Sequence, residues 1–227
     1  MTQMKTVKIY GVPMAVCPQR VMLCLVEKAV PFEIIYVDLD KMEQKEPKYM
    51  AKQPFGQVPY IEDGDFGLYE SRAIIRYYAA KYTDQGPDLL GGTLEERARV
   101  DQWLDIEAMN YNPVVFPIVL NLFIIPKMGG VGNRAEAESF VEKLGKVLDV
   151  LNEQLAKTKY LAGDKYTLAD ITFIPATQYL VEFCGMAHLI DERKHVKVWW
   201  DDITGRPAWK TVLSIAEVKG LSYLPSA

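Results

Sequence analysis

Histidine, cysteine and excess charge are all scarce in this chain of 227 residues, and each shortage argues against a class of function. The net charge is −4 and no block of basic residues occurs, so nucleic acid is not expected as a partner. The two histidines, His188 and His195, give no support for a metal site. Three cysteines (Cys17, Cys24 and Cys184) are too few and too scattered for a disulfide framework.

Long apolar runs are also missing. No apolar segment follows the first basic residue, and we find no uninterrupted stretch of membrane-spanning length. We therefore expect a cytoplasmic chain without membrane insertion. With 49% hydrophobic residues, the chain can bury one large core or two smaller ones.

The strongest pattern in the sequence is Gln53–Pro59, which reads Gln-Pro-Phe-Gly-Gln-Val-Pro. Residues 60–69 follow as two short strands joined at Asp63-Gly64, a strong hairpin signal. Pro59 cannot donate to a strand ladder, so it must lie at an edge or turn. A cis bond before Pro59 would turn the backbone of Val58 outward, where it can hold an extended peptide as an added strand.

The hairpin is followed by Glu70 and Ser71, which precede an apolar helix. A serine hydroxyl and the unpaired N–H groups of a helix start favour an anion. A backbone clamp beside such a helix start indicates a site for a small acidic peptide.

The order of elements predicts two domains. We expect a strand at 7–10, a helix at 18–28, a strand at 32–39, a loop at 41–52, the hairpin, and a helix from 71. This β-α-β, loop, β-β-α order predicts a thioredoxin-like α/β domain over residues 1–83. Residues 84–92 contain Gly-Pro and Gly-Gly and are typical of a linker. The β pattern then vanishes, so residues 93–227 should form an all-α helical domain.

Within the second domain, Thr93 should cap a long helix that Pro113 and Pro117 kink and Pro126 ends. Thr167 and Asp170 have the spacing of a capping box. We interpret these two residues, together with Pro59, as structural.

These motifs resemble those of plant phi-class glutathione transferases, and the resemblance covers the chain from Lys8 to the region of Trp209. It implies the glutathione transferase fold, a homodimer, and glutathione as a cosubstrate or bound ligand, with no metal. It assigns glutathione binding to Gln44, Lys45, Gln57, Val58, Glu70 and Ser71. Gln44 stands where the phi pattern has histidine, so it can offer only a neutral hydrogen bond.

Ala15 marks a departure from that pattern, because phi enzymes carry their catalytic serine at this position. The serine hydroxyl donates a hydrogen bond to the glutathione thiolate, and a methyl group cannot. Such a bond to a charged group is worth roughly 1.5–3 kcal/mol, or about one to two pKa units. We therefore expect weak conjugation of ordinary electrophiles.

Cys17 is followed by proline at a helix start, a setting that can produce a reactive thiolate. It resembles the Cys-Pro of thiol-transferring members of the superfamily. Cys17 lies two residues past the catalytic position, however, so an idle cysteine is the simpler interpretation.

Ala15, together with the Cys-Pro-Gln-Arg motif that begins at Cys17, resembles the corresponding segment of the phi members associated with anthocyanin and flavonoid accumulation. The resemblance implies a small aromatic ligand of flavonoid type. An apolar wall for it is expected at Met14, Val16, Phe116, Leu120, Phe123 and Tyr179. Three hypotheses follow: a glutathione transferase with weak conjugating activity, a non-catalytic flavonoid carrier, and a Cys17-dependent thiol transferase.

Overall fold

The computed structural model describes residues 5–217, 222–223 and 225 and divides the chain into two compact units. The first unit comprises Met1–Leu89 and Arg206–Ala227, and the second comprises Leu90–Gly205.

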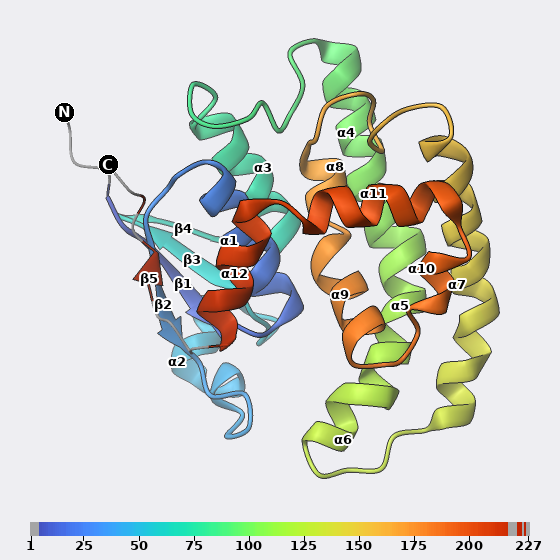
Figure 1. The fold of residues 1–227 in the computed structure, drawn as a ribbon. Helices are drawn as coiled ribbons and strands as arrows, with labels where there is room; N and C mark the ends of the chain where they lie inside the picture. Colours follow the sequence, from blue (N-terminus) through green and yellow to red (C-terminus); the bar gives the residue numbers. More distant parts are fainter. Residues whose placement is uncertain (1–4, 218–221, 224, 226–227) are drawn as a thin grey trace. The chain divides into compact units, whose positions relative to one another are not determined.

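A mixed five-stranded sheet forms the centre of the first unit (Figure 1). Its strands lie in the order β4-β3-β1-β2-β5; β1 and β2 are parallel, and the other neighbours are antiparallel. The elements of this unit are β1 (Val7–Gly11), α1 (Val16–Glu27), β2 (Phe32–Tyr36), the 3₁₀ turn η1 (Glu43–Lys45), α2 (Pro47–Met50), β3 (Tyr60–Asp63), β4 (Phe66–Tyr69), α3 (Ser71–Lys81), α12 (Pro207–Glu217) and β5 (Ser222–Tyr223). The predicted thioredoxin-like α/β fold of this part is confirmed.

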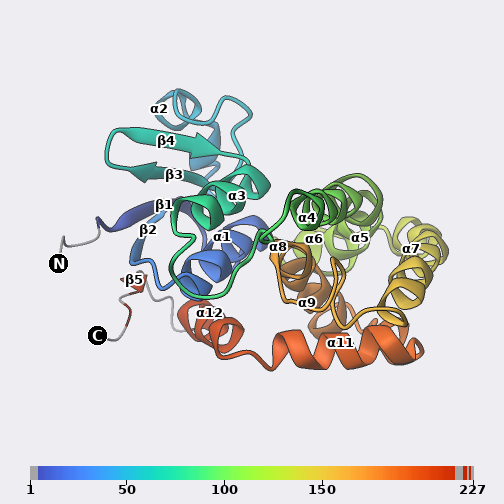
Figure 2. The ribbon, with the colours of Figure 1, turned by 90° about the horizontal axis from the view of Figure 1, so that it is seen from above.

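Helix α1 is apolar on most of its faces because neighbours cover it on several sides. Residues 18–25 are all buried, and α1 packs against both α3 and α12. Figure 2 shows α1 and α3 on the same face of the sheet. This packing brings the starts of α1 and α3 together, and both contribute to the candidate site.

The end of the chain belongs to the first unit, which differs from the expected helical domain over 93–227. Arg206 explains part of this, since its Nε and Nη2 donate to the two carboxylate oxygens of Glu27 at 2.7 and 2.9 Å. A paired fork of this kind is among the stronger ionic contacts. Strand β5 adds a further link by pairing with β2.

Part of the expected linker is also fixed to the first unit. Lys28, which is fully buried, donates from Nζ to the backbone oxygens of Gln85 and Pro87 at 2.8 and 2.7 Å. Gly86 lies between them with φ +59°, and a Cβ there would come within 2.1 Å of the Glu27 oxygen. The boundary between the units therefore falls at Leu89, inside the range expected for the linker.

The second unit is helical, as predicted (Figure 1). Its elements are α4 (Leu94–Ile106), the π-helical turn η2 (Glu107–Tyr111), α5 (Asn112–Val119), the π-helical turn η3 (Leu120–Ile124), α6 (Ile125–Lys127), α7 (Arg134–Leu155), α8 (Leu168–Ile171), α9 (Ile174–Glu182), α10 (His188–Asp191) and α11 (Lys194–Thr204).

Residues 94–127 form one continuous helical run despite its prolines. Proline removes a helical N–H, and the backbone here widens into the π-helical turns η2 and η3 instead of breaking. Pro126 was expected to end the run, but the run continues to Lys127.

By length and composition alone, the run Leu94–Lys127 could cross a membrane, since its most apolar window has a mean hydropathy of 1.6. One helix that passes this test is weak evidence for a membrane span. A core helix of a globular protein passes the same test, and α5 places Val115, Ile118 and Val119 in the core against α7 and α9. The window is nevertheless only 28% buried.

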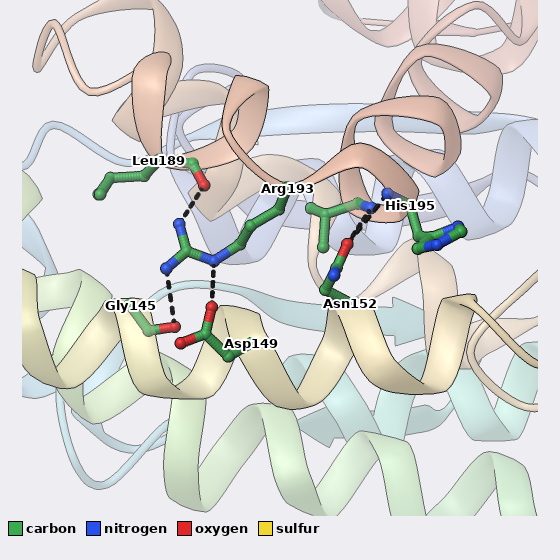
Figure 3. Close-up of polar contacts among 7 residues, drawn as sticks. Gly145, Asp149, Asn152, Leu189, Arg193 and His195 are labelled. Atoms are coloured by element: carbon green, nitrogen blue, oxygen red, sulfur yellow. Dashed lines mark hydrogen bonds and ion pairs between the residues drawn. The ribbon is translucent and has the colours of Figure 1, made fainter.

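Side-chain contacts join α7 to α10 and α11 (Figure 3). Arg193 donates to the Asp149 carboxylate at 2.7 Å and to the backbone oxygens of Leu189 and Gly145 at 2.7 and 3.1 Å. Asn152 Oδ1 accepts from the N–H of His195 at 2.9 Å. These contacts hold α10 and the start of α11 against α7.

Thr167 and Asp170 form a capping box at the start of α8. The Asp170 carboxylate accepts from Leu161 N–H and Trp199 Nε1 on one oxygen, at 3.1 and 2.9 Å, and from Thr167 N–H on the other at 2.9 Å. Burial raises the pKa of Asp170 to about 6, and these hydrogen bonds oppose the rise. One carboxylate thus joins three segments of the second unit.

Candidate functional site

An open stretch of backbone lies at one end of the β3–β4 hairpin. The Val58–Pro59 peptide bond is cis. Within the described chain, neither the N–H nor the C=O of Val58 forms a hydrogen bond. Gln57, just before it, is held by its own backbone, since its N–H donates to Gln53 Oε1 at 3.1 Å and its C=O accepts from Tyr49 Oη at 2.8 Å. A fixed strand edge with an unused donor and acceptor can bind an extended peptide.

The start of α3 lies at the same end of the hairpin. Tyr60 pairs with Tyr69, so Val58 and Ser71 each lie two residues beyond the paired ends of β3 and β4. Inside α3 the first hydrogen bond runs from Ile74 N–H to Glu70 C=O at 2.9 Å. The N–H groups ahead of Ile74 are therefore not used by the helix, and such groups attract a carboxylate.

Glu70 occupies a strained position. Its φ is +70°, a region that residues with a Cβ rarely adopt and that costs about 1–3 kcal/mol. Its side chain is exposed, and it has no hydrogen bond or ion pair in the described chain. A strained backbone that holds a free carboxylate beside Ser71 favours recognition of a cationic group such as an ammonium. We call Gln57, Val58, Glu70 and Ser71 the hairpin-end cradle.

Arg20 supports this cradle through Ser71, although the sequence patterns did not indicate Arg20 as a site residue. It lies in α1, is 0% exposed, and donates from Nη1 to Ser71 Oγ at 2.7 Å. Because the serine oxygen accepts this bond, its own hydrogen remains available for a ligand. The same Nη1 lies 3.5 Å from Cys17 Sγ.

Turn η1 brings Lys45 and Gln44 against the segment before the cradle. Gly56 has φ +59°, and a Cβ there would meet Lys45 Cδ at 2.7 Å and the Gln44 backbone oxygen at 2.8 Å. Lys45 Nζ donates to the backbone oxygen of Phe55 at 2.9 Å, so two of its three hydrogens remain for an anion. Gln44 Nε2 contacts Met42 Sδ at 3.5 Å, and its buried Oε1 has no partner.

Ala15 is the N-cap of α1, and its methyl group makes no capping hydrogen bond. Its backbone C=O accepts from Gln19 N–H at 3.0 Å. The N–H groups of Val16 and Cys17 have no acceptor in the described chain. The start of α1 therefore offers backbone donors, but no hydroxyl, at the position where the resemblance expects a serine.

All three cysteines are free thiols. Burial raises the pKa of Cys24 to about 12 and that of Cys184 to about 11, so both thiols stay protonated at neutral pH. Cys17 is half-buried and lies against the Arg20 guanidinium. Among the three, Cys17 has the setting for reactivity. No cluster of three or more metal-ligating side chains occurs among the described residues.

The expected apolar wall is divided between the units. Met14 and Val16 lie at the start of α1 in the first unit. In the second unit, Phe123 stacks on Phe183 at 4.5 Å between ring centroids and lies 5.3 Å from Tyr179. Tyr179 is only 6% exposed, so its ring supports the other two instead of offering open surface.

Phe116 and Leu120 complete the residues expected in the wall. Phe116 is exposed and Leu120 is half-buried on the same helical run. Phe183 was missed because it lies at the end of α9, where a single aromatic gives no periodic signal.

Comparisons with known proteins identify the family of this chain. Residues 5–80 match the N-terminal domain of glutathione S-transferases, and residues 111–207 match the C-terminal domain. Glutathione S-transferase F12 of Arabidopsis thaliana is 49% identical, over 92% of this chain and 98% of that protein. Glutathione S-transferase 3 of Zea mays is 42% identical, over 93% and 96%.

Solved structures give the same result. Glutathione transferase F7 from Populus trichocarpa is 45% identical with a TM-score of 0.89, over 93% of this chain and 99% of that one. Glutathione S-transferase I from maize, solved with an atrazine glutathione conjugate, is 37% identical with a TM-score of 0.86, over 94% and 99%. The chain therefore belongs to the plant phi-class (F-type) glutathione S-transferases, a family of transferase enzymes that bind glutathione.

Proposed function

We propose that this transferase holds glutathione in the hairpin-end cradle, binds a flavonoid-type aromatic compound, and conjugates ordinary electrophiles only weakly. The observation that carries the proposal is the unpaired backbone of Val58 beside Ser71 and the free carboxylate of Glu70.

Each part of glutathione has a matching group in the first unit. The N–H and C=O of Val58 match the cysteinyl backbone, as in an added strand. Ser71 and the start of α3 match the γ-glutamyl carboxylate, and Glu70 matches the ammonium group. Lys45 matches the glycyl carboxylate, with Gln44 beside it.

Conjugation of glutathione to electrophiles should be weak because of the residue at the start of α1. Ala15 has no hydroxyl to donate to a thiolate, and the N–H groups of Val16 and Cys17 are the donors that remain. Without the serine hydrogen bond, the pKa of the glutathione thiol should lie nearer to its free value of about 8.5. A smaller fraction of thiolate at neutral pH means slower attack on an electrophile.

The cluster of aromatic rings in the second unit supports the proposal that the protein binds a large aromatic ligand. Phe123 and Phe183 stack with Tyr179 behind them, and Phe116 is exposed on the same helical run as Phe123. Stacked rings with an open face suit a planar polycyclic compound. The flavonoid class itself is proposed from the resemblance of Ala15 and the Cys-Pro-Gln-Arg motif.

Calorimetry with glutathione tests the proposal. We expect the wild type to bind glutathione, and Glu70→Gln and Ser71→Ala to bind it at least tenfold more weakly, since each loses a contact to a charged group. Asp65→Asn is the matched control, because Asp65 is an exposed carboxylate at the opposite end of the same hairpin. Equal affinities for Glu70→Gln and Asp65→Asn would reject the assignment of the cradle.

The thiol-transferase alternative rests on a single contact, between Arg20 Nη1 and Cys17 Sγ at 3.5 Å. In this contact the Arg20 guanidinium is the donor and the thiol sulfur the acceptor. The carrier alternative would require flavonol binding without any turnover. Titration with a flavonol, with and without glutathione, separates the carrier from the enzyme, and absence of flavonol binding below the millimolar range would exclude both flavonoid readings.

A homodimer and a cytoplasmic location are part of the same proposal. The run Leu94–Lys127 supports association, because its apolar window is only 28% buried and Met109 is 75% exposed on it. Sedimentation should give twice the chain mass, and Met109→Lys should weaken the dimer.

A further inference from the structure

A cavity of about 290 Å³ lies within the second unit, between α4, α7 and the turn that follows α7. Its residues belong to Leu90–Gly205, whereas the hairpin-end cradle belongs to the first unit. We call it the α4–α7 cavity. It is lined by Arg99, Gln102, Trp103, Ile106, Val150, Glu153, Gln154, Lys157, Leu161 and Ala162. Its volume is at the lower end for small-molecule pockets.

Two unpaired cations line this cavity. The side chains of Arg99 and Lys157 make no hydrogen bond or ion pair with any described residue. Other basic residues on the same helices are engaged: Arg97 donates to the Gly91 oxygen, and Lys146 pairs with Glu142. Two positive side chains left free at one cavity favour an anion there.

Trp103 provides a separate indication of a ligand. It is only 6% exposed and lines the cavity, yet its indole N–H has no acceptor among the described residues. That nitrogen is not among the fully buried atoms that lack a partner, so it is open to solvent and to a ligand. Trp199 differs, because its Nε1 donates to Asp170 at 2.9 Å. Trp103 therefore presents an unused donor and an aromatic surface at the same cavity.

The rim of the cavity is fixed before any ligand arrives. Gln154 Nε2 donates to Thr158 Oγ1 at 3.1 Å and to the Leu161 backbone oxygen at 3.2 Å, which ties the end of α7 to the following turn. Ile106 and Leu161 add apolar lining. Glu153 is the one acidic side chain in the lining, so the two cations leave a net positive charge.

We propose that the α4–α7 cavity is a binding site for a small aromatic anion, such as a one- or two-ring carboxylate. Arg99 and Lys157 hold the acidic group, Trp103 Nε1 donates to it or to a second oxygen, and the ring packs on Trp103 and Ile106. This site is independent of glutathione binding.

Titration of the ¹⁵N-labelled full-length protein with 2-naphthoate, in the presence of saturating glutathione, tests the site by NMR. The indole signal of Trp103, assigned by its loss in Trp103→Phe, should shift on binding, and that of Trp199 should not. 2-Naphthamide, which is uncharged but similar in shape, should bind at least tenfold more weakly. Binding is measured on the wild type, and Trp103→Phe serves only to assign the signal.

Variants then test the cations. Arg99→Ala with Lys157→Ala should weaken naphthoate binding at least tenfold, and both side chains are exposed enough for replacement without repacking. Lys143→Ala is the matched control, because Lys143 lies on α7 over the Phe140 ring and outside the cavity. An unshifted Trp103 signal, equal binding of the amide, or equal binding by the double variant would each overturn the proposal.

Discussion

Arg20 and Ser71 are joined by a buried hydrogen bond of 2.7 Å between Nη1 and Oγ, which connects α1 to the first residue of α3. The guanidinium is fully buried and Ser71 is 4% exposed, so water competes little for either partner of this hydrogen bond. The bond makes the serine oxygen an acceptor and leaves its hydrogen to be donated. The residue proposed to bind the γ-glutamyl carboxylate is thus oriented by a residue of another helix.

The first prediction concerns Arg20→Met. Removing the guanidinium leaves the Ser71 hydroxyl without its donor, so we expect glutathione to bind about tenfold more weakly, the loss of roughly 1.4 kcal/mol. KM for glutathione should rise more than kcat falls. Calorimetry and steady-state kinetics measure both.

Lys28→Met is the control for that variant, because Lys28 is equally buried at the C-cap of the same helix and bonds to Gln85 and Pro87 instead. Both variants should lower the unfolding free energy, and only Arg20→Met should affect glutathione. In a double-mutant cycle, Arg20→Met should add little to Ser71→Ala. Fully additive losses would show that Arg20 acts through the fold alone.

The second prediction is a gain of activity in Ala15→Ser. A restored hydroxyl should stabilise the thiolate by roughly 1.5–3 kcal/mol, which corresponds to about 10- to 100-fold in conjugation of 1-chloro-2,4-dinitrobenzene at neutral pH. Ala15→Gly supplies no donor and should show no gain. If the serine variant is no faster than the wild type, the explanation from a missing donor is wrong.

The third prediction separates the roles of the thiols. Cys17→Ser should leave glutathione affinity within about threefold of wild type. Where the wild type exchanges disulfides with a mixed disulfide of glutathione, Cys17→Ser should abolish that activity. Cys184→Ser is the control, because burial raises the pKa of Cys184 to about 11. Exchange that survives Cys17→Ser would eliminate the thiol-transferase alternative.

The fourth prediction concerns the stability of the second unit. Asp170→Asn replaces an oxygen that accepts hydrogen bonds by an NH₂ group that faces donors. We expect a loss of about 2–4 kcal/mol in unfolding free energy at neutral pH, measured by urea titration. Asp164→Asn, at an exposed aspartate of the preceding turn, should change it by less than about 0.5 kcal/mol.

The pH dependence of the same group has a defined sign. The pKa of Asp170 is about 6 in the fold, raised by burial, against about 3.9 in an unfolded chain. The folded state therefore binds the proton more tightly, and the stabilisation is present below pH 4 and lost as the pH rises through 6. The stability difference between wild type and Asp170→Asn should shrink by ~3 kcal/mol from pH 3.5 to 7. A constant difference would contradict this.

The fold could be predicted wherever the signal is local. The hairpin at Asp63-Gly64, the helix starts at Thr93 and Thr167, and the β-α-β order each depend on a few neighbouring residues, and the structure shows each of them. The contact between Arg206 and Glu27 spans 179 positions, so no local pattern could show that the last helix joins the first unit.

The candidate site was predictable in its ligand-facing residues and not in their supports. Val58, Glu70 and Ser71 follow a recognisable motif. Arg20 was missed because an arginine in a helix is normally exposed, and its burial follows from the packing of α1 against α3. An arginine amid the apolar residues of α1 was the one available signal. Gln53 and Tyr49 were missed as well, since their contacts with Gln57 depend on the path of the loop.

The most direct test of the central claim is amide hydrogen exchange at Val58, measured by NMR with and without glutathione. The Val58 N–H has no acceptor in the described chain, so it should exchange readily in the free protein. We predict that saturating glutathione slows this exchange at least tenfold and shifts the Ser71 amide signal. Glutathione that binds while both amides stay unchanged would place the tripeptide elsewhere and contradict the account.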